Sequence, residues 1–263
     1  MKIIIPMAGM GKRMRPHTLT IPKPLLPVGG KPIVQRLVES IAAVTKEKID
    51  EIAFVTGHFG TQVENELKEI AKRVGAKGSI HYQDDPMGTA HAVLCAADAL
   101  QGKVVVAFAD TLFRASFNMD EEKDGIIWVH KVDDPSSFGV VKLDENSFIT
   151  DFIEKPAQPV SNLAIIGIYY FREGEKLKKE LQFLVDNNYR VNGEFQLTDA
   201  LENMKNKGTR FTTETVEEWL DCGNKNATVQ TNQRILEFEK EDALISPSAQ
   251  ITDSLIIKPG FIG

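Results

Sequence analysis

A glycine turn followed by well-spaced cations is the first part of this sequence that could do chemistry. The chain begins MKIIIPMAGMGKRMRPHTLTIPKPLLPVGGKP, and residues 1–38 hold seven Lys or Arg and no Asp or Glu. Glycines after a short apolar run let backbone N–H groups gather around an anion. Arg13 offers a planar fork for phosphate oxygens, and Lys23 offers a compact charge on a backbone that Pro22 and Pro24 stiffen. These residue types predict a site for a phosphate-rich ligand.

The two common phosphate-binding glycine motifs do not fit this turn. A dinucleotide site has a third glycine and an acid about 20 residues later. Met14 stands at the position of the third glycine, and the first acid in the chain is Glu39. A P-loop continues from Gly-Lys to Ser or Thr, whereas Gly11 and Lys12 are followed by Arg13. A turn with a purely structural role is the remaining alternative, and a dehydrogenase is disfavoured.

Two later stretches place polar side chains directly after apolar runs. Gln83 carries both a donor and an acceptor, which suits the N3–H and the carbonyls of uracil or thymine. Gly88 would let backbone groups approach such a base, and Thr89 can cap a helix. Asp110 follows the apolar run 104–109, where a buried carboxylate is costly unless it is paired or binds a metal. A solvated loop for Gln83 and a helix N-cap for Asp110 are the structural alternatives.

The opening segment resembles the signature of the sugar-1-phosphate nucleotidyltransferases, G-x-G-x-R-x-x-P-x-T followed by P-K-P-L. This motif covers residues 9–25, and later motifs extend the resemblance over most of residues 1–235. Among these enzymes the chain is most similar to glucose-1-phosphate thymidylyltransferases. The resemblance implies that a sugar-1-phosphate oxygen attacks the α-phosphorus of a nucleoside triphosphate in line and that pyrophosphate leaves. A phosphate nucleophile is already ionised at pH 7, so this chemistry needs positioning and charge stabilisation rather than a general base.

The resemblance also assigns roles to residues by their places in the motifs. The nucleotide-binding positions are Ala8, Gly9, Gly11, Gln83, Gly88 and Thr89, and the catalytic positions are Arg13, Lys23 and Lys155. The sugar-binding positions are Gly139, Glu154, Asn162 and Gly167, which lie in or after the runs FGVV and EKP. Asp110 and Asp221, the latter in a match to W-x-D-x-G, are expected to hold Mg²⁺, which often takes one or two carboxylates plus substrate phosphates. Thr198 and Asp199 are expected mainly to begin a helix.

The expected substrates are dTTP and glucose-1-phosphate, which would give dTDP-glucose and pyrophosphate. A uridylyltransferase using UTP and a mannose-1-phosphate guanylyltransferase stay open, because the run PKPLLPVGGKPI is shared too widely to exclude them. An alternative of another class is a catalytically silent regulatory subunit that senses sugar nucleotides. Such relatives tend to lose the loop arginine or a metal aspartate, and here Arg13, Asp110 and Asp221 are all present.

The elements that must position these residues follow an α/β pattern. Apolar runs alternate with helical patterns over the first half, which predicts a Rossmann-like mixed, mainly parallel sheet with helices on both faces. The expected strands are 3–5, 52–55, 79–82 and 104–109. One helix is expected to start at Pro32, a second to cover 62–74 and a third to cover 89–99. Closely spaced strands at 126–129, 140–143, 148–153 and 163–171 predict an antiparallel or mixed extension. Helices are expected again over 175–186, 197–205 and 224–239.

The C-terminal tail has a different period. Ile245, Ile251 and Ile257 recur every six residues, which is the signature of a parallel β-helix. Few repeats are present and such stacks need several units for stability, so either a left-handed β-helix begins here or the spacing is a coincidence. The predicted organisation is therefore a nucleotidyltransferase catalytic domain over 1–240 and an incomplete hexapeptide-repeat tail over 241–263.

Composition limits the remaining classes. The net charge of −6 argues against a general nucleic-acid binder. The N-terminal apolar run is too short for a signal peptide, and no stretch reaches the roughly 20 apolar residues that span a bilayer. Cys95 and Cys222 lack metal-site spacing and form no disulfide framework. We therefore expect a cytoplasmic protein without nucleic-acid or membrane partners, and a homo-oligomer stays open.

Overall fold

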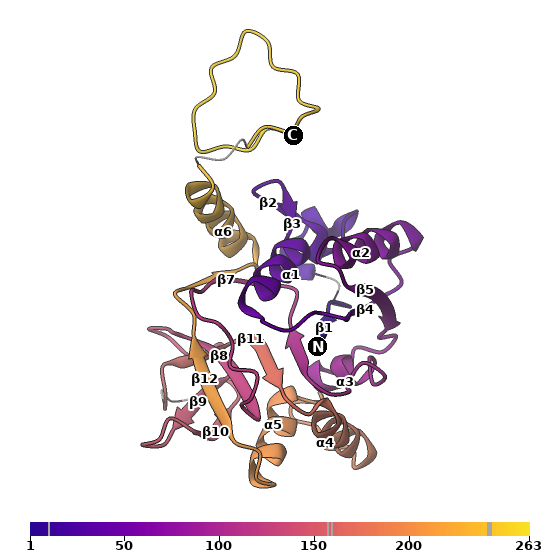
Figure 1. Ribbon diagram of the computed structural model, residues 1–263, viewed down its shortest axis with the longest axis vertical. Helices are drawn as coiled ribbons and strands as arrows, with labels where there is room; N and C mark the ends of the chain where they lie inside the picture. The colour runs from indigo at the N-terminus through magenta and orange to yellow at the C-terminus, as the bar shows by residue number, and fades with distance from the viewer. Residues whose placement is uncertain (10, 157, 159, 241–243) are drawn as a thin grey trace.

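A mixed β-sheet forms the centre of the molecule (Figure 1). The computed structural model describes residues 1–9, 11–156, 158, 160–240 and 244–263. Within them, the sheet has the order β10-β9-β11-β6-β1-β4-β5, and β8 pairs with β11 and carries β12 on its other side. The parallel part comprises β6 (Val104–Ala107), β1 (Lys2–Pro6), β4 (Glu51–Thr56) and β5 (Lys77–Tyr82). The predicted mixed sheet is confirmed.

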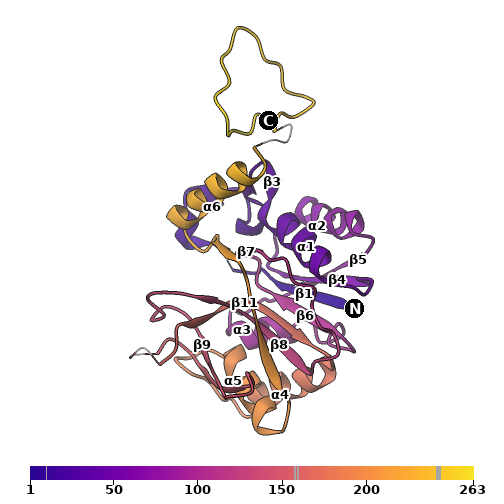
Figure 2. The ribbon, with the colours of Figure 1, turned by 60° about the vertical axis from the view of Figure 1, so that its left-hand side comes forward.

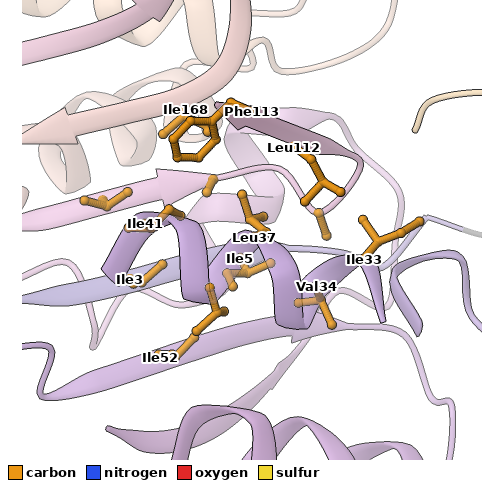
Figure 3. Packing of buried hydrophobic residues seen from close by; sticks show 14 of the residues in the cluster. Ile3, Ile5, Ile33, Val34, Leu37, Ile41, Ile52, Leu112, Phe113 and Ile168 are labelled. Carbon is orange, nitrogen blue, oxygen red and sulfur yellow. The ribbon is translucent and has the colours of Figure 1, made fainter. Parts of the chain in front are cut away.

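Helices cover both faces of this sheet (Figure 2). The helices α1 (Ile33–Val44) and α2 (Thr61–Arg73) pack on one face, and α3 (Thr89–Leu94), α4 (Gly174–Asp186) and α5 (Leu197–Asn206) pack on the other. Alternation along β1 explains why both faces are filled: Ile3 and Ile5 join the first core, shown in Figure 3, and Ile4 joins the second. None of the described helices is long and apolar enough to cross a bilayer.

The second half of the sheet is the predicted mixed extension, and most of its strands pair antiparallel, as short connections allow. The strand β11 (Leu163–Phe171) runs antiparallel to β6, to β8 (Gly125–Lys131) and, through one residue pair, to β9 (Val140–Leu143). The turn from β9 to β10 (Ile149–Ile153) is closed by Asp144, whose Oδ1 accepts from the N–H groups of Asn146 and Phe148. The last strand of the sheet, β12 (Phe211–Thr215), lies parallel to β8.

Several elements differ from the predictions. The hairpin β2 (Pro27–Val28) and β3 (Lys31–Pro32) was not expected; it pairs Pro27 with Pro32, so Pro32 precedes α1 instead of opening it. The helix predicted over 89–99 ends at Leu94, and the chain continues in turns stabilised by bonds such as Ala96 N–H to Val93 O. The strands β7 (Thr111–Arg114) and β13 (Glu218–Asp221), which pair antiparallel, were also missed.

The C-terminal tail leaves the body after α6 (Lys225–Phe238) (Figure 1). Residues 244–263 form one irregular turn of chain that a parallel bridge between Ile245 and Ile262 closes. Ile251 and Ile257 are exposed on it, and the Phe261 ring lies against Gly30 in the β2–β3 turn. The predicted boundary at 240/241 adjoins residues 241–243, which lie outside the described residues, and the β-helix interpretation stays a prediction.

Candidate active site

The loop after β1 folds back so that its glycine meets the segment that carries Lys23. Gly11 has φ +57°, and an added Cβ there would lie 3.0 Å from Thr18 Cγ2 and 3.1 Å from Lys23 Cβ. Thr18 Oγ1 donates to Gly11 O at 2.9 Å. A single turn, η1 (Lys12–Met14), then presents Arg13, and a second, η3 (Lys23–Leu25), presents Lys23. The local sequence therefore brings both predicted cations to one place.

A cleft of about 710 Å³ opens at the carboxyl ends of β1 and β6. This volume lies in the range of ligand sites, and the edge is the one at which open α/β sheets bind ligands. Its lining includes nine residues with predicted roles: Ala8, Gly9, Gly11, Arg13, Lys23, Gln83, Gly88, Thr89 and Asp110. The structure thus gathers the predicted nucleotide positions and two of the three predicted catalytic positions around one cleft.

Lys23 and Asp110 form an ion pair in this cleft. Lys23 Nζ lies 2.7 Å from Asp110 Oδ2, and the lysine side chain is only 11% exposed. Asp110 follows β6 in the turn to β7, so the predicted alternative of a helix N-cap is wrong. A largely buried ammonium needs a partner of opposite charge, which explains why the carboxylate lies there.

Asp221 reaches the same corner from the far end of the chain. It ends β13 opposite Thr111, and the next residue, Cys222, donates its N–H to Asp110 O at 2.9 Å. Burial raises the pKa of Asp221; the Gly223 N–H opposes this rise, the charge of Asp110 adds to it, and the charges of Lys23 and Arg13 lower it. The side chain lines a neighbouring cavity of about 410 Å³ between β13 and α6 instead of the main cleft.

The donor set fits Mg²⁺ in its usual protein setting. No cluster of three or more His, Cys, Asp or Glu that could enclose a metal occurs in the described part of the chain. Mg²⁺ is commonly held by one or two carboxylates together with substrate phosphates, and Asp110 and Asp221, whose segments meet through the Cys222 N–H bond to Asp110 O, would be these carboxylates. Because burial disfavours the charge on Asp221, a cation shared with Asp110 would offset an electrostatic cost that the fold already carries.

The loop between β5 and α3 forms the end of the cleft that carries Gln83. Gly88 has φ +110°, and a Cβ there would lie 2.5 Å from Phe195 O, so close packing on the segment before α5 requires glycine. The prediction that Thr89 caps its helix is wrong: Gly88 is the N-cap residue of α3, and Thr89 is the first residue of that helix. Its Oγ1 accepts the N–H of Leu197 at 2.9 Å, at the start of α5. The loop is thereby held in place by a segment that lies 108 residues further along the chain.

A smaller cavity of about 210 Å³ adjoins the cleft and shares Thr89 and Phe108 with it. Three of the four predicted sugar positions line it: Gly139, Glu154 and Gly167. Asn162 lies outside this lining, exposed just before β11, where its carbonyl accepts from Val132 N–H. Its sugar role stays a prediction without structural support.

Lys155 stands beside the smaller cavity rather than in its lining. Its side chain is 65% exposed, and its Nζ lies 3.6 Å from Glu154 Oε1. Its φ is +41°, a left-handed conformation that is uncommon for a residue other than glycine. Such conformations concentrate at functional sites, and this one agrees with the predicted role.

Sequence reasoning missed several residues of the smaller cavity: Phe108, Ser137, Ile165, Tyr169, Gln196 and Leu197. A signal was present for part of this set. Ile165 and Tyr169 stand two residues on either side of Gly167 in a predicted strand, and residues at this spacing share one face. For Phe108 the apolar run 104–109 predicts only a strand position and no contact with a ligand. Thr198 lies in the first turn of α5, as predicted, and also lines the cavity.

The fold matches that of solved nucleotide-diphospho-sugar transferases. The chain belongs to the nucleotidyl transferase family, whose model matches residues 2–237. This match confirms the predicted family.

Relatives carry different names. A bifunctional GlmU protein of Methanococcus maripaludis is 29% identical over 269 residues, which are 100% of this chain and 61% of that protein. The chain therefore spans less than two thirds of that relative. A glucose-1-phosphate thymidylyltransferase of Streptomyces antibioticus is 28% identical over 287 residues, covering 100% of this chain and 78% of that protein. A solved UDP-glucose pyrophosphorylase in complex with UDP-glucose aligns with a TM-score of 0.72 and 26% identity, over 90% of this chain and 98% of that one.

Gly9→Val is expected to lower kcat/KM for the nucleotide about 100-fold. The added side chain would displace the bound nucleotide, and a displacement of about 1 Å in a reacting ligand can cost this much. Chain neighbours aside, no atom of the described residues lies within 4 Å of a Cβ added at Gly9, so the valine side chain would extend into the cleft. The thermal midpoint should equal that of the wild type. Near-normal activity in the folded variant would contradict a ligand position against this loop.

Proposed function

We propose that this protein transfers a nucleoside monophosphate from dTTP to glucose-1-phosphate, giving dTDP-glucose and pyrophosphate. The observation that carries the proposal is the adjacency of two unlike cavities across Thr89 and Phe108. One cavity has the glycine loop, Arg13 and Lys23 for a triphosphate, and the other has Glu154 to accept sugar hydroxyls. A reaction that joins a nucleotide phosphorus to a sugar phosphate needs these two ligands side by side.

Protein groups on both sides of the two cavities would position the substrates. Arg13 and the amides of the β1 loop would bind the β- and γ-phosphates, and Lys23 would neutralise charge at the α-phosphate. Lys155 would orient the sugar phosphate, whose oxygen attacks the α-phosphorus. As that P–O bond forms, the bond to the β-phosphate oxygen breaks, and the electron pair leaves with pyrophosphate. The attacking phosphate carries its charge already, so no proton has to be removed.

Asp110 and Asp221 would hold Mg²⁺ in this reaction. The ion would supply charge neutralisation on the transferring phosphates when bound. The carboxylates would keep it beside Lys23, whose ammonium already contacts Asp110. Lys23 would then be free to turn toward the α-phosphate.

Two relatives bear on the identity of the base and the sugar. The thymidylyltransferase relative favours dTTP, and the pyrophosphorylase solved with UDP-glucose favours UTP as the second candidate. Both keep glucose-1-phosphate as the sugar. A silent regulatory subunit is disfavoured because Arg13 and Lys23 line the same cleft and Asp110 is paired within it.

A substrate panel tests the proposal. Each of dTTP, UTP, GTP, CTP and ATP is incubated with glucose-1-phosphate and Mg²⁺, and pyrophosphate release is measured. We expect the highest kcat/KM with dTTP and the next highest with UTP. A repeat with mannose-1-phosphate and glucosamine-1-phosphate tests the sugar. Absence of release with every combination would overturn the reaction class, and preference for GTP with mannose-1-phosphate would overturn the substrate assignment.

A further inference from the structure

We propose that His91 is a positioning residue that fixes the side-chain amide of Gln83, so that Gln83 Oε1 faces the nucleobase as a hydrogen-bond acceptor. This orientation would select bases that carry a ring N–H beside a carbonyl. The inference rests on the proposed function, because it assumes that the cleft receives a nucleoside triphosphate with its base near Gln83.

The orientation of Gln83 follows from two contacts of the same atom. Its Nε2 donates to the carbonyl oxygen of Gly88 at 3.3 Å and lies 3.1 Å from His91 Nδ1. A backbone carbonyl can only accept, so the nitrogen of the amide, and not its oxygen, must face this side. His91 Nδ1 must then accept as well, which requires neutral imidazole with its proton on Nε2.

The other half of the Gln83 amide is left for a ligand. Gln83 lines the cleft, and no donor in the described part of the chain bonds to its Oε1. An acceptor at this position matches the N3–H of uracil and thymine and the N1–H of guanine. It opposes the unprotonated N3 of cytosine and N1 of adenine, because two acceptors would face each other. The Gly88 bond alone is long, so His91 supplies the second contact that resists an amide flip.

The surroundings of His91 favour the neutral form that this role needs. Burial lowers the pKa of His91 below its ordinary value of 6.5, Asp85 raises the pKa, and Arg190 lowers it. The thiol of Cys95, one turn further along the chain, lies 4.0 Å from Nδ1, and burial together with Asp84 raises its pKa, so it stays uncharged. Protonation of His91 would set an N–H donor against Gln83 Nε2. Affinity for the base should therefore fall at pH values below 6.5, as the pH drops through the lowered pKa of His91.

Two variants of His91 separate this role from simple packing. His91→Leu removes the acceptor. His91→Asn keeps an oxygen acceptor near the position of Nδ1 but cannot titrate. For each protein we would measure kcat and KM with dTTP, UTP and CTP at pH 7.5 and 5.5. His91→Leu is expected to raise KM for dTTP and UTP about tenfold, the value of one lost hydrogen bond, with kcat changed about twofold or less.

The discriminating results are selectivity and pH dependence. His91→Leu should narrow the preference for dTTP over CTP, and His91→Asn should keep that preference at pH 7.5. Between pH 7.5 and 5.5 the wild type should show a larger rise in KM than His91→Asn. The substrate phosphates titrate equally in both assays, so the difference between the two proteins reports the titration of His91. Unchanged selectivity in His91→Leu, or equal pH dependence of the wild type and His91→Asn, would overturn the inference.

A double-mutant cycle tests whether His91 acts through Gln83. In a Gln83→Ala background, His91→Asn and His91→Leu should have the same KM, because the group that they position is gone. A persistent difference would show an independent structural effect and would overturn the inference. Thermal melts identify any variant that fails to fold. If His91→Leu does not fold, the rise in KM between pH 7.5 and 5.5, compared between the wild type and His91→Asn, decides whether the inference holds. If the wild type releases no pyrophosphate with any nucleotide, the proposed function fails, and that result is distinct from every outcome above.

Discussion

Arg13→Ala is expected to lower kcat/KM for nucleotidyl transfer by about 10²–10³-fold, the range seen when one preorganised group that stabilises transition-state charge is removed. Arg13 lines the cleft, is exposed, and makes no ion pair or side-chain hydrogen bond within the described residues. Its guanidinium is therefore available to the phosphates of a bound nucleotide. Because the fold does not use the side chain, the thermal midpoint of the variant should stay at the wild-type value.

Arg15→Ala is the matched control for this prediction. Arg15 is two residues further along the same loop, is also exposed, and does not line the cleft. Both variants remove one positive charge from the basic segment, so a general loss of electrostatic attraction would affect them alike. A specific role of Arg13 in phosphate binding requires a large loss of kcat/KM in Arg13→Ala and near-normal kcat/KM in Arg15→Ala. Equal losses in the two variants, measured at the same ionic strength, would contradict the assignment.

The glycine loop and its cations could be predicted because their geometry is local. Gly11 lies against both Thr18 and Lys23 within a short stretch of chain. Proline and glycine restrict or release the backbone residue by residue, so sequence spacing translates directly into position. The same holds for β1, whose uninterrupted apolar run predicts a strand that is buried on both faces, as observed.

The corner that joins Asp110 to Asp221 could not be derived in this way. It depends on the pairing of β7 with β13, two strands of four residues that stand far apart in the sequence. Strands this short carry little periodicity, and pairing between distant segments leaves no local mark. Only the resemblance to a family placed Asp221 beside Asp110. The walls of the smaller cavity show the same limit, since Phe108 and Tyr169 meet there through the antiparallel pairing of β6 with β11.

One contact shows how this fold meets a requirement of its proposed chemistry. A cleft built for a triphosphate must hold several cations before the ligand arrives, and unpaired cations are costly when they are partly buried. Among the described cations that line the cleft, Lys23 is the least exposed, and its ammonium is paired with the Asp110 carboxylate. If that carboxylate binds Mg²⁺ when substrate is present, the ion pair opens as the phosphates bring their own negative charge to Lys23. The pair would then serve the ligand-free protein and the metal site in turn.

Asp221→Asn is expected to reduce turnover at least about 100-fold, because a metal ion on the transferring phosphates contributes several kcal/mol. Without Mg²⁺ the variant should not lose stability. The pKa of Asp221 is raised, chiefly by burial, so the folded protein favours the protonated, uncharged form. This carboxyl therefore contributes most to stability below its ordinary pKa of 3.8, and that contribution is lost as the pH rises through the raised value. Asparagine, which stays neutral, should give a thermal midpoint in EDTA at pH 7 equal to or above that of the wild type.

Asp110→Asn separates the metal role from the structural one, because it removes the charge that pairs with Lys23. It should lose turnover to a similar extent, but its thermal midpoint in EDTA should fall, since a largely buried ammonium is left without its partner. With Mg²⁺ and dTTP present, the midpoint of the wild type should rise and that of both variants should rise less, as binding to the folded state requires. Asp98→Asn, an exposed aspartate outside the linings of the cleft and both neighbouring cavities, is the control. A wild-type response to Mg²⁺ in both variants would show that the two carboxylates do not hold the ion.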